Sequence, residues 1–346
     1  MSDPLSRLTE IPRVPIALLP TPMLELARLR AKLGPDCPRI FIKRDDLTGL
    51  ALGGNKSRKL EYLLADAIKA SASAVITCGA AQSNHALQTA AACRVFGFDV
   101  RCVLYGNAPE PGVGKSGNLL LHDLLDTPIR WVSMRAGETR REQALRRGMA
   151  EEAAGVEAEG GSVYWIPTGG STAVGALGYV RALMEIRAQI PEADRDRLSA
   201  IYFASGSGGT HAGLVVGKWL ADWDVRCVGV EVDPIPPGHD GVSPFRRAIQ
   251  NLTRETAELL DISRPAVPED IELDGTCTGR AYGVETEEGR EAVRLLFQTE
   301  GILLDPVYTA KAFAAMIAAI RRKEHEPAEI VLFWHTGGAA GMFARH

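Results

Sequence analysis

Short apolar runs alternate with helical patterns along most of the chain. Apolar residues that recur every three or four positions predict helices over 86–96, 173–189, 290–300 and 310–321. Eight further apolar runs are typical of buried strands: 40–43, 74–78, 100–105, 129–132, 163–166, 200–204, 226–232 and 330–334. Because strands that alternate with helices form βαβ units, we expect an α/β protein whose parallel sheets are covered by helices on both faces.

A lysine follows a flexible glycine pair at the predicted start of another helix, in the stretch Gly53-Gly54-Asn55-Lys56. The apolar face of that helix consists of Leu60, Leu63, Leu64, Ala67 and Ile68. Lys56 lies four residues before Leu60 and shares this face, whereas Arg58 and Glu61 point elsewhere. Burial lowers the pKa of a lysine amine, and the neutral amine can form a Schiff base with a carbonyl. The alternative is an ordinary first-turn lysine that reaches solvent.

Length and composition exclude several classes of protein. A formal net charge of −4 argues against nucleic-acid binding, and the seven histidines show no metal-binding spacing. The first residues lack the pattern of a signal peptide, and no apolar run reaches membrane-spanning length. The six cysteines form no C-x-x-C pair, so we expect reduced, buried thiols and a cytoplasmic protein. His325, which has charged neighbours, is expected to be exposed.

The chain of 346 residues is long enough for two domains. Glycine pairs at 53–54 and 169–170 suggest where it enters and leaves the smaller one. We therefore expect a small domain over 53–170 and a large domain made of 1–52 plus 171–346.

Four loops follow predicted strands, and ligands of open α/β sheets bind at such strand ends. In the first loop, Gln82-Ser83-Asn84-His85, the polar groups either cap a helix or bind an anion such as a substrate carboxylate. In the second loop, which runs from Ser205 to Thr210, glycines let backbone amides approach a bound group closely. We favour a phosphate over a dinucleotide because His211 replaces the third glycine of G-x-G-x-x-G, although Glu231 has the spacing of a ribose-binding acid.

The third and fourth loops carry a tyrosine and a threonine. Tyr308 follows Asp305-Pro306-Val307 and is either a core ring or a proton donor. Thr336 follows His335 and is either a cap or a partner for the ring nitrogen of a cofactor. Tyr282 adds a second tyrosine before a helix.

Six motifs in order resemble one known family. They are Lys43-Arg44-Asp45-Asp46-Leu47-Thr48-Gly49, Gly53-Gly54-Asn55-Lys56, Gln82-Ser83-Asn84-His85, Gly206-Ser207-Gly208-Gly209-Thr210, Asp305-Pro306-Val307-Tyr308 and His335-Thr336-Gly337-Gly338. They are similar to the pyridoxal-phosphate enzymes called 1-aminocyclopropane-1-carboxylate (ACC) deaminase and D-cysteine desulfhydrase. The resemblance spans nearly the whole chain. It implies the two-lobed fold of the tryptophan synthase β subunit (fold type II), with the cofactor between the lobes, and a homodimer.

The resemblance also implies a role for each matching residue. Lys56 would hold pyridoxal 5'-phosphate as a Schiff base and later remove the Cα proton of the substrate. Asn84 would meet the ring hydroxyl, and Ser83 would help bind the substrate carboxylate. The other implied site residues are Gln82 and His85 beside the substrate, Tyr282 and Tyr308 on the substrate side, and Asn55, Lys59, Ser205, Gly206, Ser207, Gly208, Gly209, Thr210 and Thr336 around the cofactor.

Two positions separate the branches of this family. ACC deaminases carry Glu after the tyrosine of D-P-V-Y and Leu after the final histidine, whereas this chain has Thr309 and Thr336. A neutral hydroxyl near the pyridine nitrogen makes the ring a weaker electron sink than a carboxylate does. Expelling sulfide needs less help than opening a cyclopropane, so the threonines favour the desulfhydrase branch. Ala281 and Ala310 replace glycines of that branch and leave the choice of substrate open.

We therefore predict a lyase that converts D-cysteine to pyruvate, ammonia and sulfide. L-Cysteate sulfo-lyase and ACC deaminase remain as alternatives among enzymes. A pyridoxal-phosphate-binding protein without turnover is an alternative from another class. A nicotinamide-dependent dehydrogenase is a further one, and the broken glycine pattern argues against it.

Overall fold

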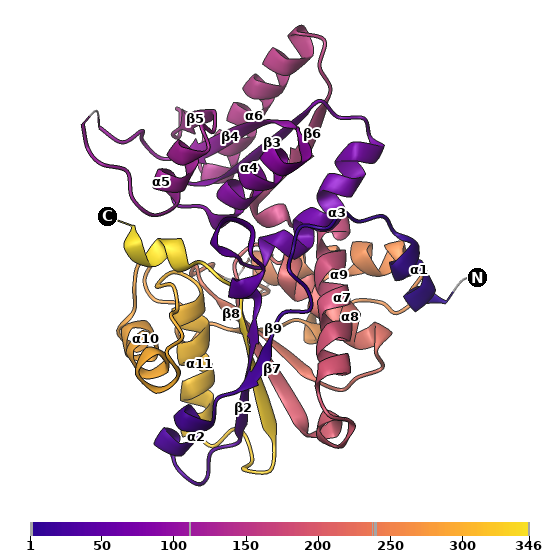
Figure 1. Cartoon of the computed structure of the whole chain (residues 1–346), viewed down its shortest axis with the longest axis vertical. Helices are drawn as coiled ribbons and strands as arrows, with labels where there is room; N and C mark the ends of the chain where they lie inside the picture. The colour runs from indigo at the N-terminus through magenta and orange to yellow at the C-terminus, as the bar shows by residue number, and fades with distance from the viewer. Residues whose placement is uncertain (1–2, 111, 237, 239–240, 345–346) are drawn as a thin grey trace.

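The computed structural model describes residues 3–110, 112–236, 238 and 241–344, and this part of the chain contains ten strands and eleven α-helices (Figure 1). The strands are β1 (Met23–Glu25), β2 (Arg39–Arg44), β3 (Ala74–Ala80), β4 (Asp99–Tyr105), β5 (Ile129–Val132), β6 (Val163–Ile166), β7 (Leu198–Ser205), β8 (Arg226–Glu231), β9 (Glu272–Asp274) and β10 (Ile330–His335). The helices are α1 (Pro4–Glu10), α2 (Ala27–Leu33), α3 (Lys56–Lys69), α4 (Asn84–Phe96), α5 (Gly117–Leu124), α6 (Arg141–Ala158), α7 (Ala173–Gln189), α8 (Gly209–Leu220), α9 (Pro244–Leu259), α10 (Glu287–Glu300) and α11 (Thr309–Arg321).

The larger sheet has the strand order β1-β2-β10-β7-β8-β9. β1 pairs antiparallel with β2 at one edge, and the other neighbours pair in parallel. Buried side chains of α2, α10 and α11 pack on one face, and those of α7, α8 and α9 pack on the other (Figure 1). Because both faces are covered, every residue of β10 is buried, which explains its unbroken apolar run.

The smaller sheet has the strand order β5-β4-β3-β6, and all its strands are parallel. Helices α3 and α4 pack on one face, and α6 packs on the other. Its strands lie between residues 74 and 166, inside the segment predicted as the small domain, although the boundaries themselves stay a prediction. The predicted fold class, an α/β protein with two parallel sheets covered by helices, is confirmed. Each predicted strand is present, with ends that differ by at most two residues.

Helix α3 differs from the prediction in its charged residues. Ile68, predicted on the apolar face, is 50% exposed, whereas Arg58 and Glu61 are 1% and 2% exposed. Arg58 is buried because its guanidinium donates to Asp45 at 2.8 Å and to Glu185 at 2.9 Å. These carboxylates come from the segment after β2 and from α7, so the pairing joins α3 to the larger sheet and its helices.

His325 is also buried, contrary to the prediction. It is 4% exposed, and its Nε2 lies 2.8 Å from the Tyr202 hydroxyl. Its Nδ1 lies 3.2 Å from a carboxylate oxygen of Glu329. The charged neighbours in the sequence face solvent, while these partners hold the ring inside the fold.

The start of α3 is tied to elements far away in the sequence. Gly54 and Gly337 form an isolated bridge, and the carbonyl of Gly53 accepts a hydrogen bond from Nε2 of Gln88 on α4 at 2.9 Å. The loop after β10 and the second turn of α4 therefore both meet the glycine pair that precedes Lys56.

The fold also bears on two exclusions made from the sequence. No helix in the described ranges is long and apolar enough to cross a membrane. Among the same residues, no group of three or more His, Cys, Asp or Glu side chains could hold a metal ion. All six cysteines are free and buried, as predicted.

Candidate active site

Lys56 is the first residue of α3, and its amine lies in a mostly enclosed setting. Nζ donates a hydrogen bond to Oδ1 of Asn55 at 2.7 Å. Burial lowers the pKa of Lys56 to about 8, although the negative charge of Asp305 acts in the opposite direction. A large fraction of the amine is therefore neutral near pH 8, as a nucleophile requires.

Asn55 fixes Lys56 between two parts of the fold. Its backbone N–H donates to the carbonyl of Thr336 at 3.0 Å, and its Nδ2 donates to the hydroxyl of Thr210 at 3.0 Å. Gly54 must be glycine here, because a Cβ would lie 2.7 Å from Nε2 of Gln88 at a φ of 131°. The lysine is thus held by the loop after β10 on one side and by the start of α8 on the other.

The amine of Lys59 lies close to two hydroxyls and to glycine backbone. Nζ of Lys59 donates to the carbonyl of Gly169 at 3.1 Å, and no described carboxylate pairs with it. Burial, together with the charge of Lys56, lowers the pKa of Lys59 well below its usual value. The hydroxyl of Ser171 lies 2.8 Å from that of Ser207 and accepts the N–H of Gly209 at 3.1 Å. We call these five residues the cradle.

The cradle has no room for a side chain at its centre. A Cβ on Gly209 would lie 2.8 Å from Nζ of Lys59 and 2.7 Å from the Ser171 hydroxyl. Gly208 is the N-cap of α8, with a φ of 85° and no side-chain cap of its own, so the positive end of the helix lies at the cradle. A buried amine without a carboxylate partner, next to the positive end of a helix, suits a bound anion.

Two other residues of the glycine loop lie apart from the cradle centre. A Cβ on Gly206 would lie 3.3 Å from the ring of Tyr308, so the loop passes directly against that tyrosine. The hydroxyl of Ser205 points to Nδ1 of His211 at 3.4 Å. The structure therefore turns the Ser205 side chain into the interior and away from its predicted neighbours.

The loop after β3 is stiffened by internal hydrogen bonds. The hydroxyl of Ser83 accepts the N–H of Ala86 at 3.2 Å, so the helix cap is formed. Nε2 of Gln82 donates to the carbonyl of Ser116 at 3.1 Å, and its Oε1 accepts the N–H of Asn118 at 2.7 Å. The side chain of Gln82 is thus occupied by the segment that begins α5.

His85 lies deeper than its neighbours and is 3% exposed. Its Nε2 lies 2.9 Å from the hydroxyl of Thr77, which itself donates to the carbonyl of Ile166 at 3.0 Å. Burial, together with the charges of Lys56 and Lys59, holds the pKa of His85 well below its usual value, so the ring is neutral. The structure brings His85 next to the two lysines rather than to the surface of the loop.

Two tyrosines meet on the other side of the site. The hydroxyls of Tyr282 and Tyr308 share a short hydrogen bond, and their rings meet edge to face with centroids 5.9 Å apart. The guanidinium of Arg141 lies 5.0 Å from the centroid of the Tyr282 ring and pairs with Asp233 at 2.7 Å. Burial raises the pKa of both tyrosines, and the charge of Arg141 opposes this rise. Both hydroxyls therefore keep their protons at neutral pH.

The two threonines that separate the family branches have different surroundings. Thr309 is fully buried, and its hydroxyl donates to a carboxylate oxygen of Asp305 at 2.7 Å. The same carboxylate also accepts the backbone N–H groups of Val307, Tyr308 and Thr309. The hydroxyl of Thr336 is engaged by no described residue. The hydroxyl of Thr309 is thus hydrogen-bonded within the turn that begins α11, whereas the hydroxyl of Thr336 is available to a ligand.

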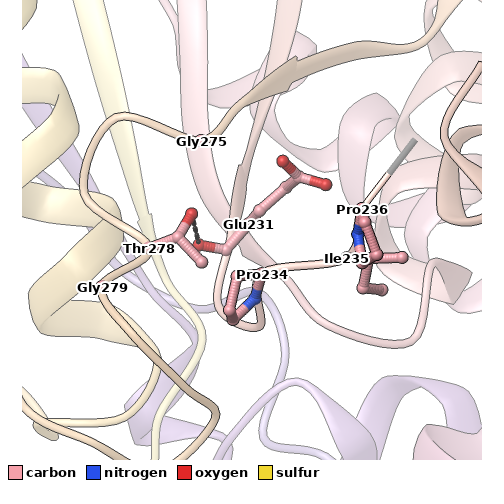
Figure 2. Close-up of a pocket in the computed structure, with 7 residues that line it drawn as sticks. All are labelled: Glu231, Pro234, Ile235, Pro236, Gly275, Thr278 and Gly279. Atoms are coloured by element: carbon pink, nitrogen blue, oxygen red, sulfur yellow. Dashed lines mark hydrogen bonds between the residues drawn. The ribbon is translucent and has the colours of Figure 1, made fainter. Parts of the chain in front are cut away.

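A separate hollow of about 360 Å³ lies at the end of β8, and Figure 2 shows the Glu231 side chain extending into it. It is lined by Glu231, Pro234, Ile235, Pro236, Gly275, Thr278 and Gly279. Thr278 donates its hydroxyl to the carbonyl of Glu231 at 3.0 Å, and burial raises the pKa of the Glu231 carboxyl. Apart from Glu231, which the dinucleotide alternative invoked, the lining contains none of the residues predicted from the loops.

Three residues at the site were missed from the sequence. Ser171 completes the cradle, Arg141 covers Tyr282, and Asn118 holds the loop of Gln82. Arg141 belongs to a basic pair that is typical of an exposed helix face, so its pattern gave no signal. Asn118 stands just before an apolar run, a common helix start, and Ser171 follows a glycine pair. Those local patterns indicate turns and caps, and only the fold brings the three side chains to the site.

Comparison with known proteins indicates which family of enzymes this site belongs to. The model of a family described as "Pyridoxal-phosphate dependent enzyme" matches residues 14–337. D-cysteine desulfhydrase from Salmonella choleraesuis (strain SC-B67) is 41% identical over 347 residues, which cover 99% of each chain. A crystal structure of an ACC deaminase homologue superimposes with a TM-score of 0.84 at 37% identity and covers 99% of this chain and 97% of the other. A pyridoxal 5'-phosphate-dependent aspartate racemase shares the fold at 16% identity, with a TM-score of 0.62 over 92% of this chain and 90% of its own.

Proposed function

Because the chain belongs to the pyridoxal-phosphate-dependent enzymes, we propose that it is a lyase that converts D-cysteine and water to pyruvate, ammonia and hydrogen sulfide. The observation that carries the choice of substrate is the similarity to a D-cysteine desulfhydrase over the whole length of both chains. The ACC deaminase homologue supports a second candidate, ACC deamination. Thr309 and Thr336 favour the first candidate, since the ACC deaminase pattern has Glu and Leu at these positions.

The residues at the site fit pyridoxal 5'-phosphate. The cradle offers a buried lysine amine and hydroxyls of the kind that hold a phosphate, and Gly209 leaves the space that a Cβ would fill. The side-chain amide of Asn55 links the amine of Lys56, which it accepts through Oδ1, to the hydroxyl of Thr210 at the start of α8, to which it donates through Nδ2. The available hydroxyl of Thr336 suits a ring nitrogen. In this proposal, Lys59, Ser207, Gly208, Gly209 and Thr210 hold the phosphate, and Asn84 and Thr336 hold the ring.

Bound pyridoxal phosphate supplies an aldehyde that condenses with amines and a ring that delocalises negative charge from Cα. Lys56 would hold the cofactor, and its neutral Nζ would take the Cα proton of the substrate. The pKa of about 8 leaves the amine able to accept that proton near neutral pH. Asp305 then lies close enough to stabilise the resulting ammonium.

The loop after β3 and the tyrosine pair position the substrate from opposite sides. Backbone N–H groups at the start of α4, with the hydroxyl of Ser83, receive the substrate carboxylate, and Gln82 supports them through its bonds to the start of α5. Tyr282 and Tyr308 keep their protons at neutral pH because burial raises the pKa of each hydroxyl. They donate a proton to the departing sulfur or orient it. His85 acts from the interior and supports the loop through Thr77.

The proposal is tested by the release of pyruvate and sulfide from D-cysteine and L-cysteine, of pyruvate and sulfite from L-cysteate, and of 2-oxobutyrate from ACC, each with added pyridoxal phosphate. We expect pyruvate and sulfide from D-cysteine at a rate well above keto-acid release from the other three. Release from ACC or L-cysteate alone would move the function to that substrate. A protein that binds the cofactor but releases no keto acid from any of the four would be a binding protein.

A second arm of the test uses Lys56→Ala. Removing the amine should abolish the covalent cofactor absorbance and lower turnover by at least about a thousandfold, because the nucleophile and the base are lost together. Lys218→Ala, on the solvent side of α8, is the matched control and should leave both unchanged. A Lys56→Ala protein with normal turnover would refute the scheme.

We also propose that the protein works as a cytoplasmic homodimer. Leu18, Leu52, Leu124 and Phe343 are at least half exposed, which gives the surface around η2 (Leu50–Leu52), α5 and η6 (Ala339–Phe343) apolar area to cover. The six free, buried thiols suit a reducing compartment. Light scattering on the purified protein tests the dimer, and a mass of one chain would refute it.

A further inference from the structure

Asn118 lies in the first turn of α5 and is 1% exposed. Its Nδ2 donates two hydrogen bonds, to the carbonyl of Gln82 at 2.9 Å and to Oδ1 of Asn84 at 2.7 Å. Its backbone N–H donates a third, to Oε1 of Gln82 at 2.7 Å. One buried asparagine therefore holds the backbone and two side chains of the segment that begins α4.

These bonds decide which way the amide of Asn84 faces. A backbone carbonyl can only accept, so the atom of Asn118 that faces Gln82 must be its NH₂ group. The same NH₂ group faces Asn84, and two NH₂ groups cannot hydrogen-bond to each other. The atom that Asn84 turns toward Asn118 must therefore be Oδ1. Nδ2 of Asn84, a donor, is left pointing away from Asn118.

The position of Asn118 is itself fixed by close packing. A Cβ on Gly117 would lie 2.6 Å from Oε1 of Gln82 and 3.1 Å from the carbonyl of Ala340, and Gly117 has a φ of 56°. Only glycine lets the start of α5 approach the loop and η6 so closely. Asn118 cannot move away from Asn84 without separating these segments.

We propose that Asn118 is a positioning residue for the cofactor, because it holds Asn84 with its NH₂ group presented to the oxygen of the cofactor ring. This inference rests on the proposed function, in which Asn84 meets the ring hydroxyl. A donor at that place stabilises the ionised ring oxygen, whereas an acceptor would repel it. Asn118 thereby sets the protonation of the ring oxygen without touching the cofactor.

The test measures the absorbance and the binding affinity of the cofactor rather than the rate of the reaction. The ionised and neutral forms of the ring oxygen in the lysine-bound cofactor absorb in the visible and the near-ultraviolet, so their ratio at fixed pH reports the contact. Asn118→Ala should lower the visible fraction and raise the dissociation constant of pyridoxal phosphate about two- to tenfold, the contribution of one hydrogen bond. Asn118→Asp should lower the visible fraction further, because a carboxylate only accepts and would draw the NH₂ group of Asn84 toward itself.

Two further variants separate this role from general support of the loop. Asn84→Ala should have at least the effect of Asn118→Ala, and the double variant should be no worse than Asn84→Ala alone. His122→Leu, a buried change on the same helix, should leave the spectrum unchanged because His122 has no hydrogen-bond partner among the described residues.

An Asn118→Ala protein with the parent's spectrum and cofactor affinity would overturn the inference. The inference would also be overturned if Asn118→Ala changed the spectrum and the cofactor affinity by the same amount in the parent and in the Asn84→Ala protein. A parent protein that shows no cofactor absorbance at all would refute the proposed function instead, so the two failures are distinguishable.

Discussion

Replacing Arg58 by methionine should destabilise the protein strongly and in a pH-dependent way. The guanidinium of Arg58 is buried and binds the carboxylates of Asp45 and Glu185. Asp45 is 0% exposed and also accepts the hydroxyl of Tyr179 at 2.6 Å. Methionine fills a similar volume, so the main change is the loss of charge and hydrogen bonds beside a buried carboxylate.

The size of the effect follows from the two states open to Asp45 in the variant. Removing one partner of a buried ion pair costs about 3–5 kcal/mol when the other stays charged. The carboxylate can avoid this by binding a proton, which costs about 1.36 kcal/mol per pH unit above its ordinary pKa of about 3.9. That cost is about 4 kcal/mol at pH 7 and about 1.5 kcal/mol at pH 5.

The sign of the pH dependence is fixed by the folded protein. Burial alone would raise the pKa of Asp45, but the charge and hydrogen bonds of Arg58 hold it below its ordinary value. The stabilisation from this carboxylate is therefore present above its ordinary pKa and is lost as the pH falls through the folded value. In Arg58→Met nothing holds the pKa of Asp45 down in this way, so the carboxylate binds a proton at less cost as the pH falls toward 5. The loss of unfolding free energy caused by the substitution should therefore shrink by about 2–3 kcal/mol between pH 7 and pH 5.

Urea unfolding of the cofactor-loaded parent and variant at pH 7 and pH 5 measures this difference. Arg321→Met is the matched control, because Arg321 pairs with Glu291 at 2.6 Å on the surface and should contribute less than about 1 kcal/mol at either pH. If Arg58→Met cost no more than Arg321→Met, or cost the same at both pH values, the reasoning about the buried pair would be wrong.

Three further outcomes follow from the site. Gly209→Ala should weaken cofactor binding at least about tenfold in equilibrium dialysis, because its Cβ would lie 2.8 Å from Nζ of Lys59; Gly155→Ala, which meets no atom within 4 Å, should bind normally. Covalent uptake of pyridoxal phosphate by the apo-protein should reach half its maximal rate near pH 8, where Lys56 loses its proton, and a rate still rising at pH 10 would contradict the lowered pKa. Arg141→Met should move the alkaline limb of the kcat profile to higher pH, since the charge of Arg141 lowers the pKa of Tyr282, and an unmoved limb would show that this tyrosine does not titrate in turnover.

The elements of the fold were readable from the sequence where a pattern was long enough. Buried parallel strands gave unbroken apolar runs, and the predicted ends were close to those observed. β1 and β9 were missed because three residues at a sheet edge give no periodic signal. Helix α3 was placed correctly at Lys56, yet the burial of Arg58 and Glu61 was not foreseen. Their partners lie in other elements, and sequence spacing within one helix contains no information about them.

The site shows the same division. The glycine loop, Lys56 and the tyrosines were predicted as site residues because each follows a strand or opens a helix. Asn118 and Ser171 were not, since each acts on a residue more than thirty positions away along the chain. Ser205 stands in the loop motif, but the strand turns its side chain toward His211. A motif thus identifies a loop, while the direction of each side chain depends on packing that the motif does not contain.

The place of β10 has a consequence for how the protein is made. It is the last of the described strands along the chain, yet it lies in the middle of the larger sheet between β2 and β7. During synthesis, β2 and β7 must wait for it, and joining them is slow because most of the chain separates β2 from β10. Until Ile330–His335 emerges from the ribosome, the unfinished sheet has open edges that invite aggregation. The backbone N–H of Asn55 also lacks its acceptor, the Thr336 carbonyl, until then. We therefore expect the cofactor to bind only after β10 has completed the larger sheet.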